Sequence, residues 1–396
     1  MLLSMAIILL TGLLLSSIFK KLGLPSILGL LLTGMILGTY ALNLIDQSIL
    51  NISSELREIA LIVILIRAGL SLDIKDLKKV GRPAILLSFL PATLEIIAIT
   101  LLAPMFFDIS YISAATMGTI VAAVSPAVVV PRMIALIQKG YGKHKQVPQM
   151  ILAAASIDDV YAIILFYATI QYQQGQSFSF MTFLNIPISI ISGIVLGLLT
   201  GYLLVYVFKQ LHMRDTVKVI IIFSAGFLLI TLEDVLQNIM PISGLLAIMS
   251  MAMMMNKMYL TLAKRLILKF EKIWVFAEMM LFILVGALVN ISVLLNVGIK
   301  AIILILLAMV FRMFAVYLAT LKTNLNAKEK LYTALSYTPK ATVQAAIGAI
   351  PLSLGLAHGE LILMVSVLAI IITAPFGAIM MDKAYHFCLT PDEKSE

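Results

Sequence analysis

The feature that most constrains this chain is a succession of long apolar stretches that fill nearly its whole length. Hydrophobic residues make up 62% of its 396 residues, charged residues only 12%, and the mean hydropathy is +1.09. A soluble domain could not keep so much apolar surface away from water. A helix of about 20 apolar residues crosses the hydrocarbon core of a bilayer. The sequence therefore predicts an all-α polytopic protein whose surroundings are the lipid bilayer.

Measured against that length, the sequence predicts thirteen transmembrane helices. They cover residues 2–19, 24–44, 56–72, 83–106, 111–137, 147–170, 181–208, 217–234, 240–256, 272–290, 296–321, 329–353 and 359–382. The seventh helix can link six helices before it to six after it. An offset of seven helices reverses the direction of the second set, which is the arrangement of an inverted repeat in many transporters.

The charges of the connecting loops predict how the chain is oriented. Most of the 28 lysine and arginine residues fall in every second loop. We expect the protein to lie in the cell membrane. The positive-inside rule then places its N-terminus outside and its C-terminus in the cytoplasm. The net charge of +8 thus belongs to membrane-flanking loops and does not indicate nucleic acid. The sequence has no phosphate-binding loop and no His/Cys metal spacing, so we expect no enzyme activity, no cofactor and an ion gradient as energy source.

Two adjacent carboxylates, Asp158 and Asp159, interrupt an otherwise apolar predicted helix. An ionised carboxylate in the middle of a bilayer costs several kcal/mol, so such residues usually bind a partner or carry ions. Oxygen ligands suit hard cations, which by extension from Mg²⁺ and Ca²⁺ includes Na⁺ and Li⁺. We expect Na⁺ or Li⁺ to compete with H⁺ for this acid pair. The hydroxyls of Ser125, Ser156 and Thr342 are candidate additional ligands.

Prolines predict interruptions at corresponding places in the two halves. Pro126 and Pro131 lie in the fifth predicted helix, and Pro339 lies in the twelfth. A proline removes a backbone donor and leaves carbonyls free, and helix ends of this kind form ion sites in transporters. An ordinary proline kink is the alternative at each position.

Five segments in the same order resemble the NHA branch of the cation/proton antiporters, which have the NhaA-like fold. These segments are residues 64–70 (ILIRAGL), 91–95 (PATLE), 123–131 (AVSPAVVVP), 157–159 (IDD) and 339–348 (PKATVQAAIG). The resemblance implies a homodimer that exchanges Na⁺ or Li⁺ for H⁺ and serves pH homeostasis. It also implies that a core domain with two crossing discontinuous helices moves as an elevator, and that Asp159 is the principal carrier with Asp158 as second carboxylate.

The same resemblance predicts a division of the chain into domains. Residues 1–80 and 217–295 would form the dimerisation domain, 81–171 and 296–384 the two halves of the core, 172–216 the linker helix and 385–396 a cytoplasmic tail. One acidic residue, Glu278, departs from the pattern, because an uncharged residue is expected there.

The embedded basic residues need acidic or dipolar partners. Arg312 keeps its charge at any working pH and must therefore find an acid in the membrane. The resemblance implies a structural salt bridge with Glu95, and Asp158 is the rival partner; a bridge to Glu95 would leave both aspartates free. Lys340 directly follows Pro339, where its ammonium can offset the negative carbonyl end of a half-helix.

Two other functions remain compatible with membrane aspartates. A K⁺/H⁺ antiporter of the same superfamily would have the same fold. An intramembrane aspartyl protease also uses two aspartates, but a shared-proton dyad needs carboxyls that face each other, normally from two helices.

Overall fold

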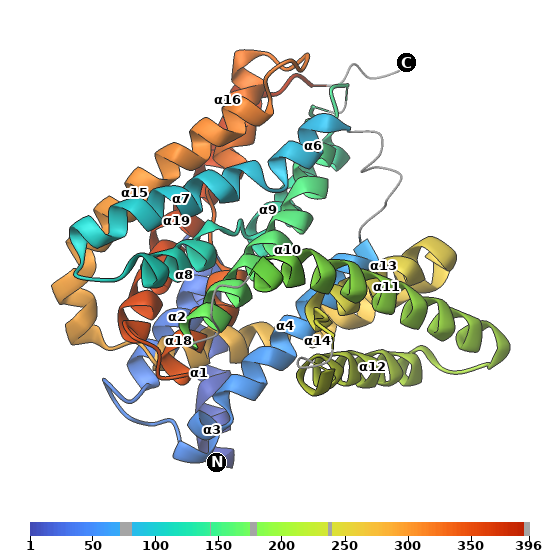
Figure 1. Cartoon of the computed structure of the whole chain (residues 1–396), viewed down its shortest axis with the longest axis horizontal. Coiled ribbons are helices and arrows are strands. Elements are labelled where there is room, and N and C mark those ends of the chain that lie inside the picture. The colour runs from blue at the N-terminus through green and yellow to red at the C-terminus, as the bar shows by residue number, and fades with distance from the viewer. Residues whose placement is uncertain (72–80, 143, 175–179, 237–239, 392–396) are drawn as a thin grey trace. The chain divides into compact units, whose positions relative to one another are not determined.

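The computed structural model describes residues 1–71, 81–142, 144–174, 180–236 and 240–391. Within them the regular structure is helical, and the one exception is an isolated bridge between Tyr141 and Pro391. The helices (Figure 1) are α1 (Leu2–Lys21), α2 (Ser26–Leu37), α3 (Gln47–Asn51), α4 (Ser53–Ser71), α6 (Arg82–Leu87), α7 (Leu90–Phe106), α8 (Tyr111–Ala122), α9 (Pro126–Lys139), α10 (Val147–Gln173), α11 (Phe180–Gln210), α12 (Asp215–Leu236), α13 (Gly244–Met258), α14 (Leu260–Ala287), α15 (Ile291–Ala319), α16 (Ala327–Ser336), α17 (Thr342–Ile347), α18 (Ile350–Ser353) and α19 (Gly359–Cys388).

The described residues contain eight helical stretches that are long and apolar enough to cross a membrane. In lipid the backbone polar groups must be satisfied within the chain, which is why such apolar stretches form helices. Shorter apolar helices occur as well, among them Ser26–Leu37 and Gly244–Met258. The expectation of an all-α multi-pass membrane protein is confirmed, and the count of thirteen transmembrane helices stays a prediction.

One predicted loop is helical. The sequence places the start of the tenth membrane segment at residue 272, whereas α14 begins at Leu260. Its first turns carry Lys264, Arg265 and Lys269. Lysine and arginine are good helix formers, and their long side chains can keep the charge in water at a helix end. A basic stretch therefore continues this helix instead of ending it.

The chain divides into two compact units. Unit 1 comprises Met1–Ser54, Asp76–Gln174 and Leu281–Glu396, and unit 2 comprises Glu55–Lys75 and Gly175–Met280. In unit 1, α7 packs against α8 and α15, and α19 packs against α15 and α16. Unit 1 thus joins both predicted core halves with residues 1–54, which the sequence assigned to dimerisation. The functional division into core and dimerisation domains stays a prediction.

Unit 2 contains a helix pair, α11 and α13, with backbones in close approach. A Cβ atom at Gly197 would overlap the carbonyl oxygen of Ala247, and one at Gly201 would overlap that of Met251. Small residues four apart allow membrane helices to pack this closely. The glycines of α11 therefore determine how these two helices meet.

We expect Gly197→Ala to destabilise the protein, because the added methyl group forces α11 and α13 apart. Overpacking of this kind costs about 1–3 kcal/mol. Gly298→Ala is the matched control, since a Cβ there meets no atom within 4 Å. Thermal unfolding of the purified protein in detergent should show a lower melting temperature for Gly197→Ala only. Equal melting temperatures for the two variants would contradict the close packing.

Two interruptions in helices meet inside unit 1. α8 ends at Ala122 and α9 begins at Pro126, while α16 ends at Ser336 and α17 begins at Thr342. Between them the amide of Ser125 donates a hydrogen bond to the carbonyl oxygen of Pro339, with an N–O distance of 2.8 Å. The two non-helical segments are therefore in direct contact.

The three prolines predicted to mark the breaks have different positions. Pro126 is the first residue of α9, where its missing N–H costs nothing. Pro339 lies between α16 and α17. Pro131 lies inside α9, which continues to Lys139, so the expectation that it marks a break is wrong. Neighbouring groups in a membrane protein can compensate a proline inside a helix.

Candidate functional site

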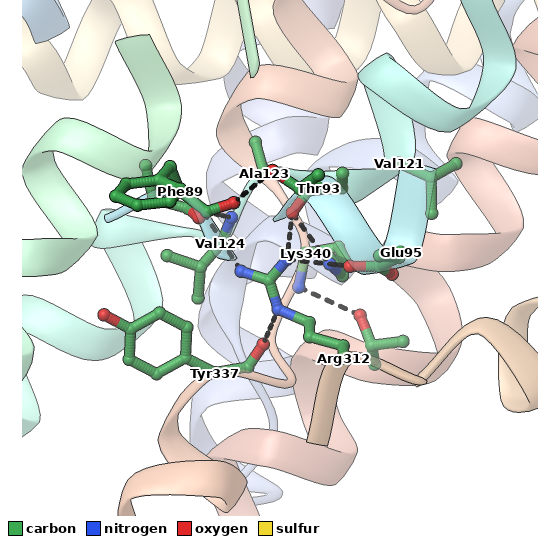
Figure 2. A network of polar contacts seen from close by, with 12 residues as sticks. Phe89, Thr93, Glu95, Val121, Ala123, Val124, Arg312, Tyr337 and Lys340 are labelled. Carbon is green, nitrogen blue, oxygen red and sulfur yellow. Dashed lines mark hydrogen bonds and ion pairs between the residues drawn. The ribbon is translucent and has the colours of Figure 1, made fainter. Parts of the chain in front are cut away.

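The centre of unit 1 contains a buried charged network around Arg312 of α15. Its Nη1 lies 2.7 Å from Glu95 Oε2 on α7, and its Nη2 lies 3.0 Å from Asp158 Oδ2 on α10. All three side chains have no exposed surface. Figure 2 shows the guanidinium between Glu95 on one side and Tyr337 on the other. The guanidinium of Arg312 thus joins three helices that are distant in sequence.

Arg312 also binds the ends of both interrupted helices. Its Nε donates to the carbonyl oxygen of Tyr337, just past the end of α16, at 2.6 Å. Its Nη1 donates to the carbonyl oxygen of Ala122, the last residue of α8. The last carbonyls of a helix have no partner within it and carry partial negative charge. The arginine therefore satisfies helix ends as well as carboxylates.

Lys340, between the two half-helices α16 and α17, forms a second ion pair with Glu95. Its Nζ lies 2.6 Å from Glu95 Oε2, the same oxygen that binds Arg312, and 3.2 Å from the carbonyl oxygen of Ala122. The sequence predicts that the Lys340 ammonium offsets the carbonyl end of a half-helix. The contact with Ala122 agrees with such a role, and the helix end in question is that of α8. The pairing with Glu95 was not predicted.

The Arg312 contacts correct one expectation. The pairing with Glu95 is present as predicted, but Asp158 is bound as well. The expectation that a bridge to Glu95 leaves both aspartates free is wrong for Asp158. A guanidinium has several N–H donors in a planar fork, so it can bind two carboxylates at once.

Gln344 of α17 is a site residue that sequence reasoning missed. Its fully buried amide Nε2 donates to the carbonyl oxygens of Ile120, Val121 and Ala123, at 2.9, 3.2 and 2.9 Å. These carbonyls lie at the C-terminal end of α8. A lone amide within the apolar stretch after Lys340 was the available signal, because a buried polar side chain must find partners.

The two aspartates differ in their surroundings although they are neighbours on α10. Asp158 Oδ2 accepts a hydrogen bond from the amide of Val124, at 2.8 Å, in addition to its contact with Arg312. Asp159 is 9% exposed, whereas Asp158 is fully buried. Within the described part of the chain, Asp159 forms no ion pair. Asp158 is therefore anchored, and Asp159 is available to a ligand.

Several buried side-chain oxygens at this place have no hydrogen-bond partner among the described residues. They are Asp158 Oδ1, Asp159 Oδ1, Ser125 Oγ, Thr342 Oγ1, Glu95 Oε1, Tyr337 Oη and Gln344 Oε1. Most buried polar atoms in proteins are paired, and an unpaired one costs about 1–3 kcal/mol. Unpaired carboxylate and hydroxyl oxygens of this kind suit a cation that has lost its water.

The other predicted residues have simpler outcomes. Ser125 and Thr342 carry oxygens of this set, and their role as cation ligands stays a prediction. The side chain of Ser156 lies outside the described part of the structure. Glu278 lies on α14 in unit 2, whereas all the residues of the network lie in unit 1. On the same unit as Glu278, the guanidinium of Arg67 lies 5.5 Å from the ring centre of Trp274.

Comparison with known proteins gives the chain a family. The family model for "Sodium/hydrogen exchanger, transmembrane" matches residues 5–382. The chain is 34% identical to sodium/hydrogen exchanger 9B2 of Homo sapiens over 374 residues, which cover 90% of this chain and 68% of that protein. It is 33% identical to sodium/hydrogen exchanger 9B1 of Homo sapiens, over 90% of this chain and 71% of that protein.

A solved structure shows the same fold. The sodium proton antiporter MjNhaP1 from Methanocaldococcus jannaschii superposes with a TM-score of 0.84 and 20% identity, and the match covers 98% of this chain and 99% of that one. The family match over nearly the whole length and the identity to the two exchangers agree with this likeness. The chain therefore belongs to the sodium/hydrogen exchanger family, whose members are membrane transporters and not enzymes.

Proposed function

We propose that this protein is a secondary-active antiporter that exchanges Na⁺ or Li⁺ for H⁺, with both ions competing for Asp159. The observation that carries the proposal is the set of unpaired buried oxygens that includes Asp158 Oδ1 and Asp159 Oδ1. Either a proton or a cation neutralises Asp159, and a neutral site crosses an apolar barrier far more easily than a charged one. Ser125 and Thr342 complete the cation's ligands. The ions are substrates, and the cycle needs no cofactor.

The charge balance of the network supports an exchange of one cation for one proton. Three carboxylates (Glu95, Asp158 and Asp159) face two basic side chains, Arg312 and Lys340. With every group ionised the network has one net negative charge. One Na⁺ or one H⁺ brings it to zero, and a second would make it positive in a low-dielectric interior. We infer that the exchange moves no net charge.

The elevator movement is proposed for the part of unit 1 that holds the site. Arg312 of α15, Gln344 of α17 and Asp158 of α10 all bind the segment that follows α8 or its end. These contacts favour movement of the crossing discontinuous helices as one body with the ion. We further propose a homodimer in the plasma membrane, with the N-terminus outside and the C-terminus in the cytoplasm.

The two alternatives differ in what supports them. A K⁺/H⁺ antiporter would use the same fold, and a direct cation test separates the two. An intramembrane protease is disfavoured for two reasons. Asp158 and Asp159 lie on the same helix, and Asp158 is already bound by Arg312 and by the amide of Val124. A protease needs two carboxyls that face each other and share a proton.

The test is the dissipation of an imposed pH gradient in proteoliposomes that contain the purified protein. We expect Na⁺ and Li⁺ to dissipate the gradient and K⁺ to have little effect. A response to K⁺ alone would favour the alternative antiporter, and no response to Na⁺ or Li⁺ would contradict the proposal.

The same vesicles test the one-for-one exchange. A membrane potential set by K⁺ and valinomycin should leave the rate of Na⁺-driven proton movement unchanged, because no net charge crosses. A charge moved per cycle would be subject to about 2.3 kcal/mol per 100 mV. A rate that rises with inside-negative potential and falls with the opposite one would contradict the charge balance.

A further inference from the structure

Tyr337 is a buried aromatic residue whose backbone and ring are both occupied by Arg312. Its carbonyl oxygen accepts the hydrogen bond from Arg312 Nε, and its ring centre lies 5.5 Å from the guanidinium carbon. The side chain has no exposed surface. Figure 2 shows the ring on the Val124 side of the guanidinium, opposite to Glu95. Tyr337 therefore belongs to the side of the network on which Asp158 is bound.

The hydroxyl of Tyr337 has no hydrogen-bond partner among the described residues. Burial of a hydroxyl without a partner is destabilising, whereas the ring alone would carry no such cost. Phenylalanine would supply the same contact with Arg312. The ring contact with Arg312 therefore does not account for the hydroxyl.

The surroundings of this hydroxyl indicate what it can bind. The ring that carries it packs on the guanidinium of Arg312, whose Nη2 lies 3.0 Å from Asp158 Oδ2. Asp158 Oδ1, like Tyr337 Oη, is buried without a partner. A hard cation gathers neutral oxygens beside a carboxylate, whereas a lone proton needs only the carboxylate. A phenol oxygen also adds no charge, so the one-for-one balance is kept.

We propose that the Tyr337 hydroxyl is a further ligand of the transported Na⁺ or Li⁺ and strengthens cation binding relative to proton binding. This inference rests on the proposed antiport function. It goes beyond the acid pair and the hydroxyls predicted from the sequence, because it adds a specificity-determining oxygen on the segment between α16 and α17.

Tyr337→Phe is a sharp test because it removes only the hydroxyl and keeps the ring on Arg312 and the backbone carbonyl. Tyr332→Phe is the matched control: Tyr332 is also fully buried on α16, and its charged neighbours are Asp382 and Arg132. We expect Tyr337→Phe to raise the KM for Na⁺ and for Li⁺ about tenfold, as the loss of one hydrogen-bond-strength contact to a charge would. The maximal rate should stay within about twofold of the wild type.

The competition with protons provides a readout that a purely structural role would not change. With Na⁺ held constant, protons should inhibit Tyr337→Phe at a higher pH than the wild type, since only cation binding is weakened. Tyr332→Phe should match the wild type in KM and in its pH profile. Unchanged KM values in Tyr337→Phe, or a lower maximal rate with the wild-type pH profile, would overturn the ligand role. A wild type without any response to Na⁺ or Li⁺ would instead overturn the proposed function itself.

Discussion

Asp159→Asn should abolish cation/proton exchange while the protein stays folded. The amide keeps the size of the side chain but can neither take up a proton at working pH nor supply a negative charge to a cation. Asp159 is buried and forms no ion pair in the described part of the chain, so its removal strands no basic partner. Exchange in proteoliposomes should fall to the background of protein-free vesicles.

Thermal unfolding separates loss of binding from loss of fold in this variant. A cation that binds only the folded protein stabilises it by about 2.7 kcal/mol at a concentration 100 times its dissociation constant. The wild type should therefore melt at a higher temperature when Na⁺ replaces a large organic cation. Asp159→Asn should melt at the same temperature in both. Exchange at the wild-type rate in this variant would show that another residue carries the ions.

Glu95→Gln should cause a large loss of stability. One carboxylate oxygen of Glu95 binds both Arg312 and Lys340, and all three side chains are fully buried. Removing a buried charge that has partners leaves those partners uncompensated and costs about 3–5 kcal/mol. Here Lys340 loses its carboxylate partner, and Arg312 keeps only Asp158. Thermal unfolding in detergent should show a large fall in melting temperature or a failure to accumulate folded protein.

A second variant keeps this prediction testable if Glu95→Gln does not fold. The double variant Glu95→Gln, Lys340→Met removes one charge of each sign and restores the wild-type net charge of the network. It should be more stable than Glu95→Gln alone, with a coupling energy of about 0.5–3 kcal/mol.

Asp382→Asn is the exposed control for these variants. Asp382 pairs with Arg132 through two contacts of 3.0 Å, but its side chain is 58% exposed. Breaking such a surface pair should cost less than about 1 kcal/mol. An equal effect of Asp382→Asn and Glu95→Gln on the melting temperature would contradict the central role of Glu95.

The sequence predicted the helical class and drew attention to the acid pair because both rest on local properties. Long apolar runs can only be helices in lipid, and adjacent carboxylates in such a run have few structural uses. The breaks beside Pro126 and Pro339 follow from the missing amide of proline. Pro131 shows the limit of that reasoning, because whether a proline interrupts a helix depends on the groups packed around it.

The contacts between distant segments were not predictable in the same way. Glu95 and Lys340 are 245 residues apart, and Arg312 and Asp158 are 154 residues apart. Composition and spacing show that Arg312 needs an acid, but they do not show that one guanidinium binds two. Gln344 binds carbonyls at the end of α8, and Tyr337 packs against the guanidinium of Arg312. Both contacts exist only after the two breaks have met.

In the proposed antiport, one cation and one proton compete for Asp159. The most direct test is the KM for Na⁺ in proteoliposomes measured over a series of pH values, with the maximal rate determined at each. Direct competition predicts that, on the acid side, the KM rises about tenfold for each unit of pH lowered while the maximal rate stays constant. A KM that does not change with pH while the maximal rate falls would contradict a shared site.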